Sequence, residues 1–421
     1  MAIRAWQAVA APAVLATAVT LAALPAGTRL VTGGFSLAAG VAALTLMAAA
    51  ALLGSRWRWV EHGFGGLDRV YAAHKWMGVW ALVLASGHFL FKAGAEGWDV
   101  APILELPGFW TRLVRQLSYV ALGLIVMLAL NRNIRYSIWR WWHKLSGPLF
   151  LIVILHWLSF KSPIAISDPA GVWLAIISTL GVAAAAYKLL LFPFLSSHVE
   201  YRVAAVSAGG GAIHLEMEPV QRPLPFTPGQ FAFISMKHDG LREPHPFTIA
   251  SGDDASDRVH FVIRGLGDYT QKLIREAKVG MYADIYAPWG RFKRSLTAKR
   301  QIWIAGGVGV SPFIAWLTDP SAVGLDQVTL FYFFTPGREF PPVDVLSKMA
   351  HERGAEFVPI PDGPDSPKFN ERFSEIVRAA GGESVEISFC GPKGLLKFVR
   401  ARMREHGIPM ANLRHEFFEF R

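Results

Sequence analysis

Six long apolar stretches fill the first half of the sequence, and each has about the 20 residues that a helix needs to cross a bilayer. They span residues 6–26, 35–54, 70–91, 113–130, 139–159 and 172–194. Of the 421 residues, 52% are hydrophobic and only 18% are charged, which excludes a disordered chain and argues against a single soluble domain. We therefore expect a multi-domain membrane protein whose residues 1–195 form a six-helix α transmembrane bundle.

Basic residues gather on alternate connections between these stretches. Residues 1–197 contain 15 Lys and Arg but 6 Asp and Glu, whereas the remaining residues contain 27 and 26. The connections before the third and fifth stretches are basic, which places them, the N-terminus and everything after the sixth stretch in the cytoplasm. The net charge of +10 therefore comes mainly from the apolar half, which indicates membrane topology rather than nucleic-acid binding. We expect a multi-pass protein of the plasma membrane, with the lipid bilayer as its partner.

The first stretch also has features of a signal peptide, because Arg4 precedes the apolar run and the segment 24–26 reads Leu-Pro-Ala. The run is long for a signal peptide, and a second span follows at once, so we expect it to remain in the protein. Neither alternative changes the predicted direction of the third span.

Four histidines are the main candidates for metal ligands, because the single cysteine excludes a Cys-ligated iron–sulfur cluster or a multi-Cys zinc site. His74 and His88 are 14 residues apart, and His143 and His156 are 13 apart, so each pair spans about 20 Å along its helix. The pairs then place one histidine from each helix at an inner depth and one at an outer depth. Two haems stacked across the membrane need two imidazole nitrogens as iron ligands at each of two depths, which this arrangement would supply. The alternative is that these histidines only form hydrogen bonds between helices.

The spacing of the second pair raises an angular problem. At 100° per residue, 14 positions nearly restore the same face of a helix, but 13 leave His156 roughly 140° away from His143. Gly147 and Pro148 lie between them and are candidates for distorting this helix. Phe150 also lies between them, either in the gap between two haems or as ordinary core.

The composition changes near residues 194–198. Strand-like runs at 200–206, 212–218, 230–237, 259–264 and 282–287 predict a small antiparallel β-barrel domain in residues 196–296. Runs at 301–305, 328–334, 356–360 and 386–389 alternate with helical patterns and predict an α/β domain with a parallel sheet in residues 297–421. Such a sheet binds nucleotides at its strand ends.

Three motifs lie in these domains. Residues 245–251, His-Pro-Phe-Thr-Ile-Ala-Ser, offer a flat apolar surface and hydroxyl groups, although they could be an ordinary strand. Residues 264–270, Arg-Gly-Leu-Gly-Asp-Tyr-Thr, place a cation and a helix start where they suit a pyrophosphate. Residues 306–313, Gly-Gly-Val-Gly-Val-Ser-Pro-Phe, suit a second pyrophosphate or form a tight strand-to-helix turn.

Taken in order, these features resemble the ferric reductase and NADPH oxidase superfamily. The resemblance also includes Phe-Cys-Gly-Pro at 389–392 and the ending Glu-Phe-Phe-Glu-Phe at 416–420. It implies FAD on the barrel, NADPH on the parallel-sheet domain and two haem b groups in the membrane. The lack of an EF-hand motif in this sequence resembles the minimal bacterial members, so we expect no regulatory extension and no obligatory regulatory subunit.

The resemblance also assigns individual residues. His74, His88, His143 and His156 would be the haem ligands. The flavin would contact His245, Pro246, Phe247 and Thr248, and its pyrophosphate Arg264, Gly267, Asp268 and Thr270. The NADPH pyrophosphate would contact Gly306, Gly307, Gly309, Val310, Ser311 and Pro312, and the nicotinamide would lie near Cys390, Gly391 and Pro392. Phe418 would stack on the flavin or simply pack in a last strand. Thr335 and Arg338 are candidates for holding the 2′-phosphate, and without such a contact NADH would serve as donor.

The implied activity is electrogenic electron transfer from NADPH through FAD, the inner haem and the outer haem to an external acceptor. We favour O2, giving superoxide, and Lys92, four residues after His88, would supply positive charge near it or anchor the helix at the interface. A ferric chelate and an extracytoplasmic partner protein are alternative acceptors. A transporter or membrane scaffold with a vestigial nucleotide domain is a different class, which a spectrum without a Soret band would favour.

Overall fold

The computed structural model describes residues 3–25, 28–91, 101–131, 133–252, 256–296 and 300–415. The chain divides between Ser196 and Ser197 into two compact units. We call the first the helical unit and the second the sheet unit.

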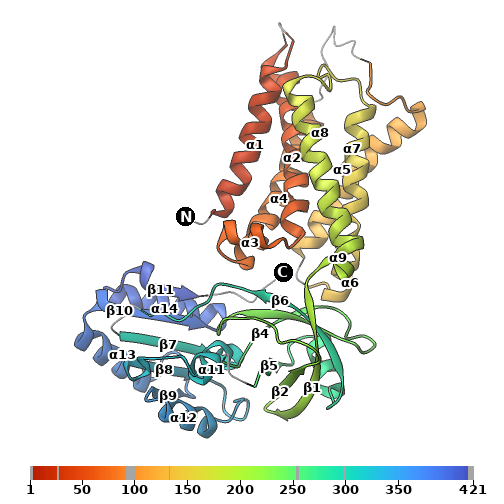
Figure 1. Cartoon of the computed structure of the whole chain (residues 1–421). Helices are drawn as coiled ribbons and strands as arrows, with labels where there is room; N and C mark the ends of the chain where they lie inside the picture. Colours follow the sequence, from red (N-terminus) through yellow and green to blue (C-terminus); the bar gives the residue numbers. More distant parts are fainter. Residues whose placement is uncertain are drawn as a thin grey trace. The chain divides into compact units, whose positions relative to one another are not determined.

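The helical unit contains a bundle of long helices with shorter ones at the connections (Figure 1). Its helices are α1 (Ala5–Ala22), α2 (Phe35–Gly54), α3 (Arg58–Phe64), α4 (Leu67–Phe91), α5 (Gly108–Leu130), α6 (Tyr136–Lys144), α7 (Ser146–Ser159), α8 (Pro169–Ala186) and α9 (Phe192–Leu195). A π-helical turn, Leu30–Gly34, leads into α2, and another, Tyr187–Leu191, connects α8 to α9.

Four helical segments in the described part of the chain are long and apolar enough to cross a membrane, not the six that we predicted. They are Ala5–Ala22, Leu30–Gly54, Gly108–Leu130 and Pro169–Leu195. The third predicted span is helical, but α4 carries Asp68, Arg69 and Lys75 near its start, which lowers its hydropathy. The fifth is divided into α6 and α7, and α7 has only 14 residues. The helical unit is nevertheless a membrane domain by the apolar character of these four segments.

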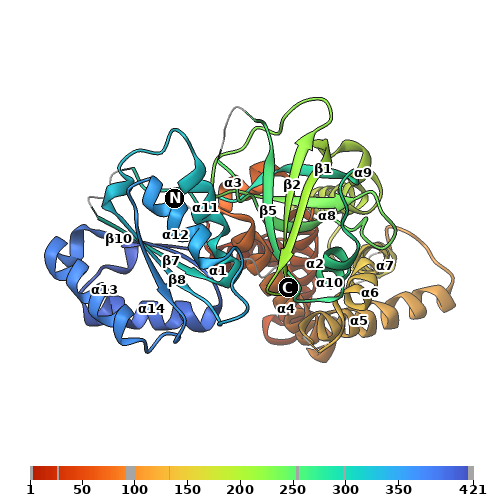
Figure 2. The same cartoon turned by 90° about the horizontal axis from the view of Figure 1, so that it is seen from below.

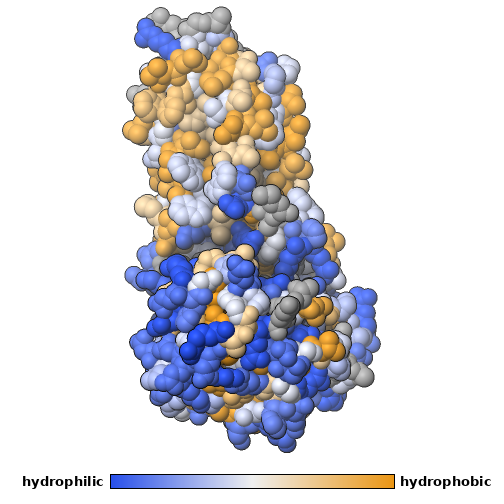
Figure 3. All heavy atoms as spheres, turned by 90° about the vertical axis from the view of Figure 1, so that its left-hand side faces the viewer, coloured by the Kyte–Doolittle hydropathy of each residue, from blue (hydrophilic) through white to orange (hydrophobic). Residues whose placement is uncertain are grey.

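Helix α2 is the centre of the bundle and packs against α1, α4 and α8. Its alanines, among them Ala42 and Ala48, are buried and allow the neighbouring helices to approach closely. Large apolar side chains point outward instead on the surrounding helices, as for Val14, Val120 and Ile176. On the face that Figure 3 shows, the surface of the helical unit is accordingly mostly apolar, whereas that of the sheet unit is mostly hydrophilic.

The first part of the sheet unit is the predicted antiparallel barrel, and it is nearly closed. Its strands are β1 (His198–Gly209), β2 (Ala212–Pro219), β3 (Phe231–Met236), β4 (His245–Thr248), β5 (Val259–Arg264) and β6 (Tyr282–Trp289), in the order β4-β3-β6-β1-β2-β5. A bridge between Ile249 and Phe261 brings the two edge strands together. Alternate residues face inward, such as Tyr201, Val203 and Ile285, and form one core. Helix α10 (Asp268–Glu276) follows β5.

The second part is the predicted parallel sheet, with the strand order β11-β10-β7-β8-β9. Its strands are β7 (Arg300–Gly306), β8 (Val328–Phe333), β9 (Glu356–Ile360), β10 (Val385–Cys390) and β11 (Leu413–His415). Helices α11 (Ser311–Thr318) and α12 (Val343–Glu352) cover one face, where Trp303 and Leu330 are buried. Helices α13 (Pro367–Ala380) and α14 (Lys393–Glu405) cover the other, where Ile304 and Phe331 are buried (Figure 2).

Candidate functional site

The four membrane histidines form two facing pairs. Helix α4 supplies His74 and His88, while α6 supplies His143 and α7 supplies His156. The ring centroids of His74 and His143 are 5.8 Å apart, and those of His88 and His156 are 6.2 Å apart. The sequence spacing therefore brings together one histidine from each helix at each end of α4.

This separation fits one metal ion between two imidazoles. An imidazole nitrogen binds a metal at about 2 Å, and the ring centre lies roughly 1 Å further from the metal, so two opposed rings have centres about 6 Å apart. Among the described residues, no group of three or more His, Cys, Asp or Glu is placed to hold a metal. The two pairs thus fit an iron whose remaining ligands come from a porphyrin.

Hydrogen bonds fix which ring nitrogen of the α4 histidines is available. The Nδ1 of His74 lies 2.8 Å from the carbonyl oxygen of Ala50, and the Nδ1 of His88 lies 2.8 Å from that of Ser36. A carbonyl only accepts, so Nδ1 carries the proton in both rings, and a neutral imidazole then has an unprotonated Nε2. Metal-binding histidines are usually held by such a bond from their other nitrogen.

The partner histidines lack this support. The Nδ1 atoms of His143 and His156 are buried and have no hydrogen-bond partner in the described part of the chain. Each pair therefore combines one anchored imidazole on α4 with one that is held by packing. His143 stacks on Trp139, with ring centroids 5.1 Å apart, and His156 contacts Phe160 at 4.7 Å.

A break in the fifth stretch resolves the angular problem of the 13-residue spacing. Helix α6 ends at Lys144, and α7 begins at Ser146, so His143 and His156 lie on different helices. Pro148 falls in the first turn of α7, where the missing N–H of proline has no helical partner to lose. The predicted distortion is therefore a break of one residue at Leu145, whose φ of −66° and ψ of −11° stay in the right-handed helical region.

Phe150 belongs to the apolar core. It is 3% exposed and packs in a cluster with Ala48 of α2 and Leu174 of α8. Gly181 of α8 makes room for it, because a Cβ there would lie 2.8 Å from the phenyl ring.

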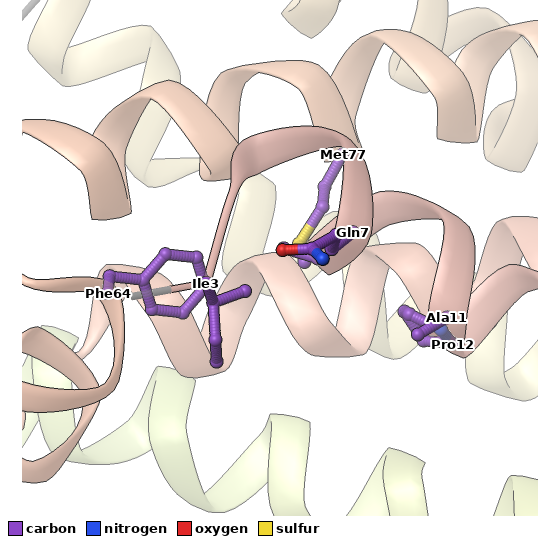
Figure 4. A pocket seen from close by; sticks show the side chains of 7 residues that line it. Ile3, Gln7, Ala11, Pro12, Phe64 and Met77 are labelled. Atoms are coloured by element: carbon purple, nitrogen blue, oxygen red, sulfur yellow. The ribbon is translucent and has the colours of Figure 1, made fainter. Parts of the chain in front are cut away.

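The helical unit also has a hollow of about 480 Å³ beside α1, α3 and α4 (Figure 4). Its lining is apolar apart from Gln7 and includes Ile3, Phe64 and Met77. It contains none of the residues predicted for a site.

In the sheet unit, residues 306–313, which we call the glycine loop, contact the segment that follows β10. Strand β7 pairs with β8 on one side and with β10 on the other, so the chain order reverses between β7 and β10. Ligands of open parallel sheets bind at the carboxyl end of such a switch point. Here β7 ends at Gly306 and β10 at the buried Cys390.

The glycines permit this contact between backbones. A Cβ on Gly309 would lie 2.3 Å from the carbonyl oxygen of Cys390, and one on Gly306 would lie 2.6 Å from the Cδ of Pro392. A Cβ on Gly391 would in turn lie 3.1 Å from the Cα of Gly306. Gly307 has a φ of +56°, and no described atom lies within 4 Å of its missing Cβ. The loop continues through a 3₁₀ turn, Gly307–Val310, into α11, where Ser311 and Pro312 are the first residues.

The residues predicted for the flavin lie on β4 and around the start of α10. His245, Pro246, Phe247 and Thr248 form β4, an edge strand of half-buried residues. The ring of His245 stacks on Tyr269, with centroids 3.6 Å apart. Burial raises the pKa of Tyr269, whose hydroxyl donates to the carbonyl oxygen of Leu241. Tyr269 was not among the predicted site residues.

Hydrogen bonds already organise the predicted pyrophosphate site. Thr270 Oγ1 accepts from the backbone N–H groups of Leu266 and Gly267, at 2.9 and 3.0 Å. Asp268 begins α10. A bound phosphate would therefore compete with the Thr270 hydroxyl for these two donors.

Arg264 joins the two parts of the sheet unit. Its guanidinium donates to the carbonyl oxygen of Gly210 at 3.0 Å and to that of Arg338 at 2.5 Å. Thr335 and Arg338 are exposed in a turn after β8, where the N–H of Arg338 donates to the carbonyl of Thr335. The structure thus places the cation predicted for FAD next to the turn predicted for the 2′-phosphate. Local sequence patterns contain no signal for this contact.

Two predicted residues, Lys92 and Phe418, lie outside the described residues, as does the 416–420 ending.

Comparisons with known proteins match two regions of the chain. Residues 39–155 match the family "Ferric reductase like transmembrane component", and residues 198–288 match "FAD-binding domain". The first region contains His74, His88 and His143 and ends one residue before His156, and the second contains β4 and the 264–270 motif. These two matches, in this order, confirm the resemblance found in the sequence.

The chain is also similar to several characterised proteins. It is 26% identical over 212 residues to "Oxidoreductase NdmD" of Pseudomonas putida, which covers 48% of this chain and 34% of that protein. It is 29% identical over 204 residues to the "Toluate 1,2-dioxygenase electron transfer component" of the same organism, covering 46% and 59%. The chain thus spans between a third and three fifths of the length of these two relatives.

Among solved structures, phthalate dioxygenase reductase is 19% identical, with a TM-score of 0.44, and the match covers 52% of this chain and 68% of that one. A ferredoxin NADP+ reductase from Neisseria gonorrhoeae is 17% identical, with a TM-score of 0.44, and the match covers 52% and 98%.

Proposed function

We propose that this oxidoreductase, which has the architecture of the ferric reductase and NADPH oxidase type, transfers electrons from cytosolic NADPH across the plasma membrane to O2 and produces superoxide. The two matched regions support a transmembrane, flavin-dependent electron-transfer protein. The observation that carries the finer proposal is the pair of facing imidazoles at each end of α4, at 5.8 and 6.2 Å.

The chain's own residues would bind and orient the cofactors. We propose that His74 with His143 and His88 with His156 hold two haem b groups, that β4 and the start of α10 hold FAD, and that the loops after β7 and β10 hold NADPH. When bound, these groups supply hydride acceptance and single-electron transfer. The close packing of Gly309 on Cys390 would align the two nucleotide-binding loops as one surface.

This proposal also assigns α4 and the α6–α7 segment to the membrane, although they are less apolar or shorter than the other spans. His74 and His88, which add to the polar character of α4, would be turned toward the bundle and bound to iron, which offsets the cost of placing them among lipids. The short α7 would be extended by α6 to complete one crossing. The basic connections before α4 and α6 support a cytoplasmic location for these ends.

The first experiment is spectroscopic. The purified full-length protein should show a Soret band, and its haem content should be two per chain. An absence of haem would contradict the proposal, whatever the state of the flavin.

The second experiment identifies the acceptor. With FAD and NADPH, the holoprotein should reduce cytochrome c in a reaction that superoxide dismutase inhibits. The name of the matched transmembrane family favours one alternative, a ferric chelate. Rapid reduction of a ferric chelate that is insensitive to dismutase and persists without oxygen would support that alternative and contradict superoxide production.

A further inference from the structure

Helix α2 contains the same three-part arrangement twice. In each copy, a glycine of α2 faces a histidine of α4, and the histidine bonds to the backbone carbonyl four residues before the glycine. The copies are Gly40 with His88 and the carbonyl of Ser36, and Gly54 with His74 and the carbonyl of Ala50. The two glycines are 14 residues apart, as are the two histidines.

Helix geometry explains why a glycine suits this position. In an α-helix, the carbonyl of residue i−4 accepts from the N–H of residue i and retains a second lone pair. The Cα–Cβ bond tilts toward the N-terminus, so the side chain of residue i lies over the preceding turn and covers that carbonyl. A glycine leaves the carbonyl open to a donor from a neighbouring helix.

The two copies differ in how tightly they fit. A Cβ on Gly40 would lie 2.8 Å from Nδ1 of His88, 3.1 Å from Cε1 and 3.2 Å from Cγ. A Cβ on Gly54 would lie 3.7 Å from Cε1 of His74 and 3.9 Å from its Nδ1, which are ordinary contacts. Both imidazoles bond to a backbone carbonyl of α2, but only that of His88 also lies so close to the glycine that a Cβ there would clash with it.

His88 has little freedom to retreat. The hydroxyl of Ser36 donates to the backbone carbonyl of His88 at 2.9 Å and lies 3.3 Å from its Nδ1. Backbone and ring are thus both tied to the first turns of α2, so an added methyl group at position 40 would displace the ring.

We propose that Gly40 is a positioning residue for the ligand His88: its missing side chain seats the imidazole on the Ser36 carbonyl and holds Nε2 toward His156. Gly54 has the same location relative to His74 but is not required for it. This inference rests on the proposed haem-binding role of the histidine pairs.

The test compares Gly40→Ala with its matched control Gly54→Ala in the full-length holoprotein. Haem is measured per bound FAD by the pyridine haemochrome method, and the low-spin ferric signals are recorded by electron paramagnetic resonance. We expect Gly40→Ala to lose about half of the haem or to shift the signal of one haem only, and Gly54→Ala to retain both haems unchanged. An unchanged Gly40→Ala protein, or equal losses in the two variants, would overturn the proposal.

A double-mutant cycle covers the case in which Gly40→Ala fails to fold. If the added methyl group acts through the imidazole, it should have no effect once the ring is absent. The variant carrying Gly40→Ala and His88→Ala should therefore match His88→Ala in yield, haem content and thermal midpoint. A further loss in the double variant would show that Gly40 acts through helix packing instead. A wild-type protein without haem would refute the proposed function itself, which is a separate outcome.

Discussion

Replacing Gly309 by alanine tests the proposed NADPH site. The new Cβ would lie 2.3 Å from the carbonyl oxygen of Cys390, whereas ordinary contacts begin at 3.4 Å. Because both sides of this contact are backbone, the glycine loop and the segment after β10 must separate by about 1 Å, and a misplacement of about 1 Å can lower a rate about 100-fold. We expect a loss of about 100-fold in the kcat/KM for NADPH, equivalent to about 2.7 kcal/mol.

The assay is anaerobic reduction of bound FAD by NADPH in a stopped-flow spectrophotometer. The matched control is Gly394→Ala, since no described atom lies within 4 Å of that missing Cβ in α14. Flavin and haem contents should be equal in the two variants and the wild type. A Gly309→Ala protein that reduces its flavin within threefold of the control rate would refute this reasoning. Loss of FAD would also refute it, because the damage would then extend beyond the nucleotide loops.

Three further predictions concern other parts of the molecule. His143→Ala should lose about half of the haem and leave the His88–His156 pair loaded; retention of two haems per chain would be incompatible with ligation by His143. Arg338→Ala should raise the KM for NADPH about 10-fold but not that for NADH, because a charged hydrogen bond to the 2′-phosphate is worth roughly 1.5–3 kcal/mol; equal changes for both nucleotides would exclude this role. Burial and the neighbouring His260 lower the pKa of His214 below its usual 6.5, so the unfolded chain binds the proton first and stability falls as the pH decreases below about 6.5. His214→Gln should flatten this decrease in the thermal midpoint of the sheet unit, and an unchanged pH profile would contradict it.

The sequence predicts the elements of the sheet unit well because their signals are local. The run at 356–360 coincides with β9, and the run at 301–305 lies within β7. Alternating burial in the barrel and continuous apolar strands in the parallel sheet are the patterns that the two kinds of sheet impose. The pairing of the four histidines was predictable as well, since the rise per residue of a helix alone predicts which residues share a depth.

The number of apolar helices was wrong for a physical reason. Hydropathy decides whether a helix can face lipid, but α4 is packed against α2 and carries polar groups into the bundle. The position of the break at Leu145 was not predictable, because Gly147 and Pro148 indicate that the helix is disturbed but not at which residue or by what angle. Gly40 was overlooked because a glycine in an alanine-rich helix has the same local pattern as one that merely allows helix packing. Its role depends on His88, which is 48 residues away.

The interruption between α6 and α7 also determines where this protein can tolerate a change in length. Adding one residue to the continuous helix α4 between its two histidines would turn everything beyond it by about 100°, and one ligand would face away from its counterpart. We expect an extra residue beside Leu145 to disturb the pairs less, since α6 ends and α7 begins there and the helical repeat is not continuous between His143 and His156. Insertions and deletions among relatives should therefore collect at this joint and be absent from the middle of α4.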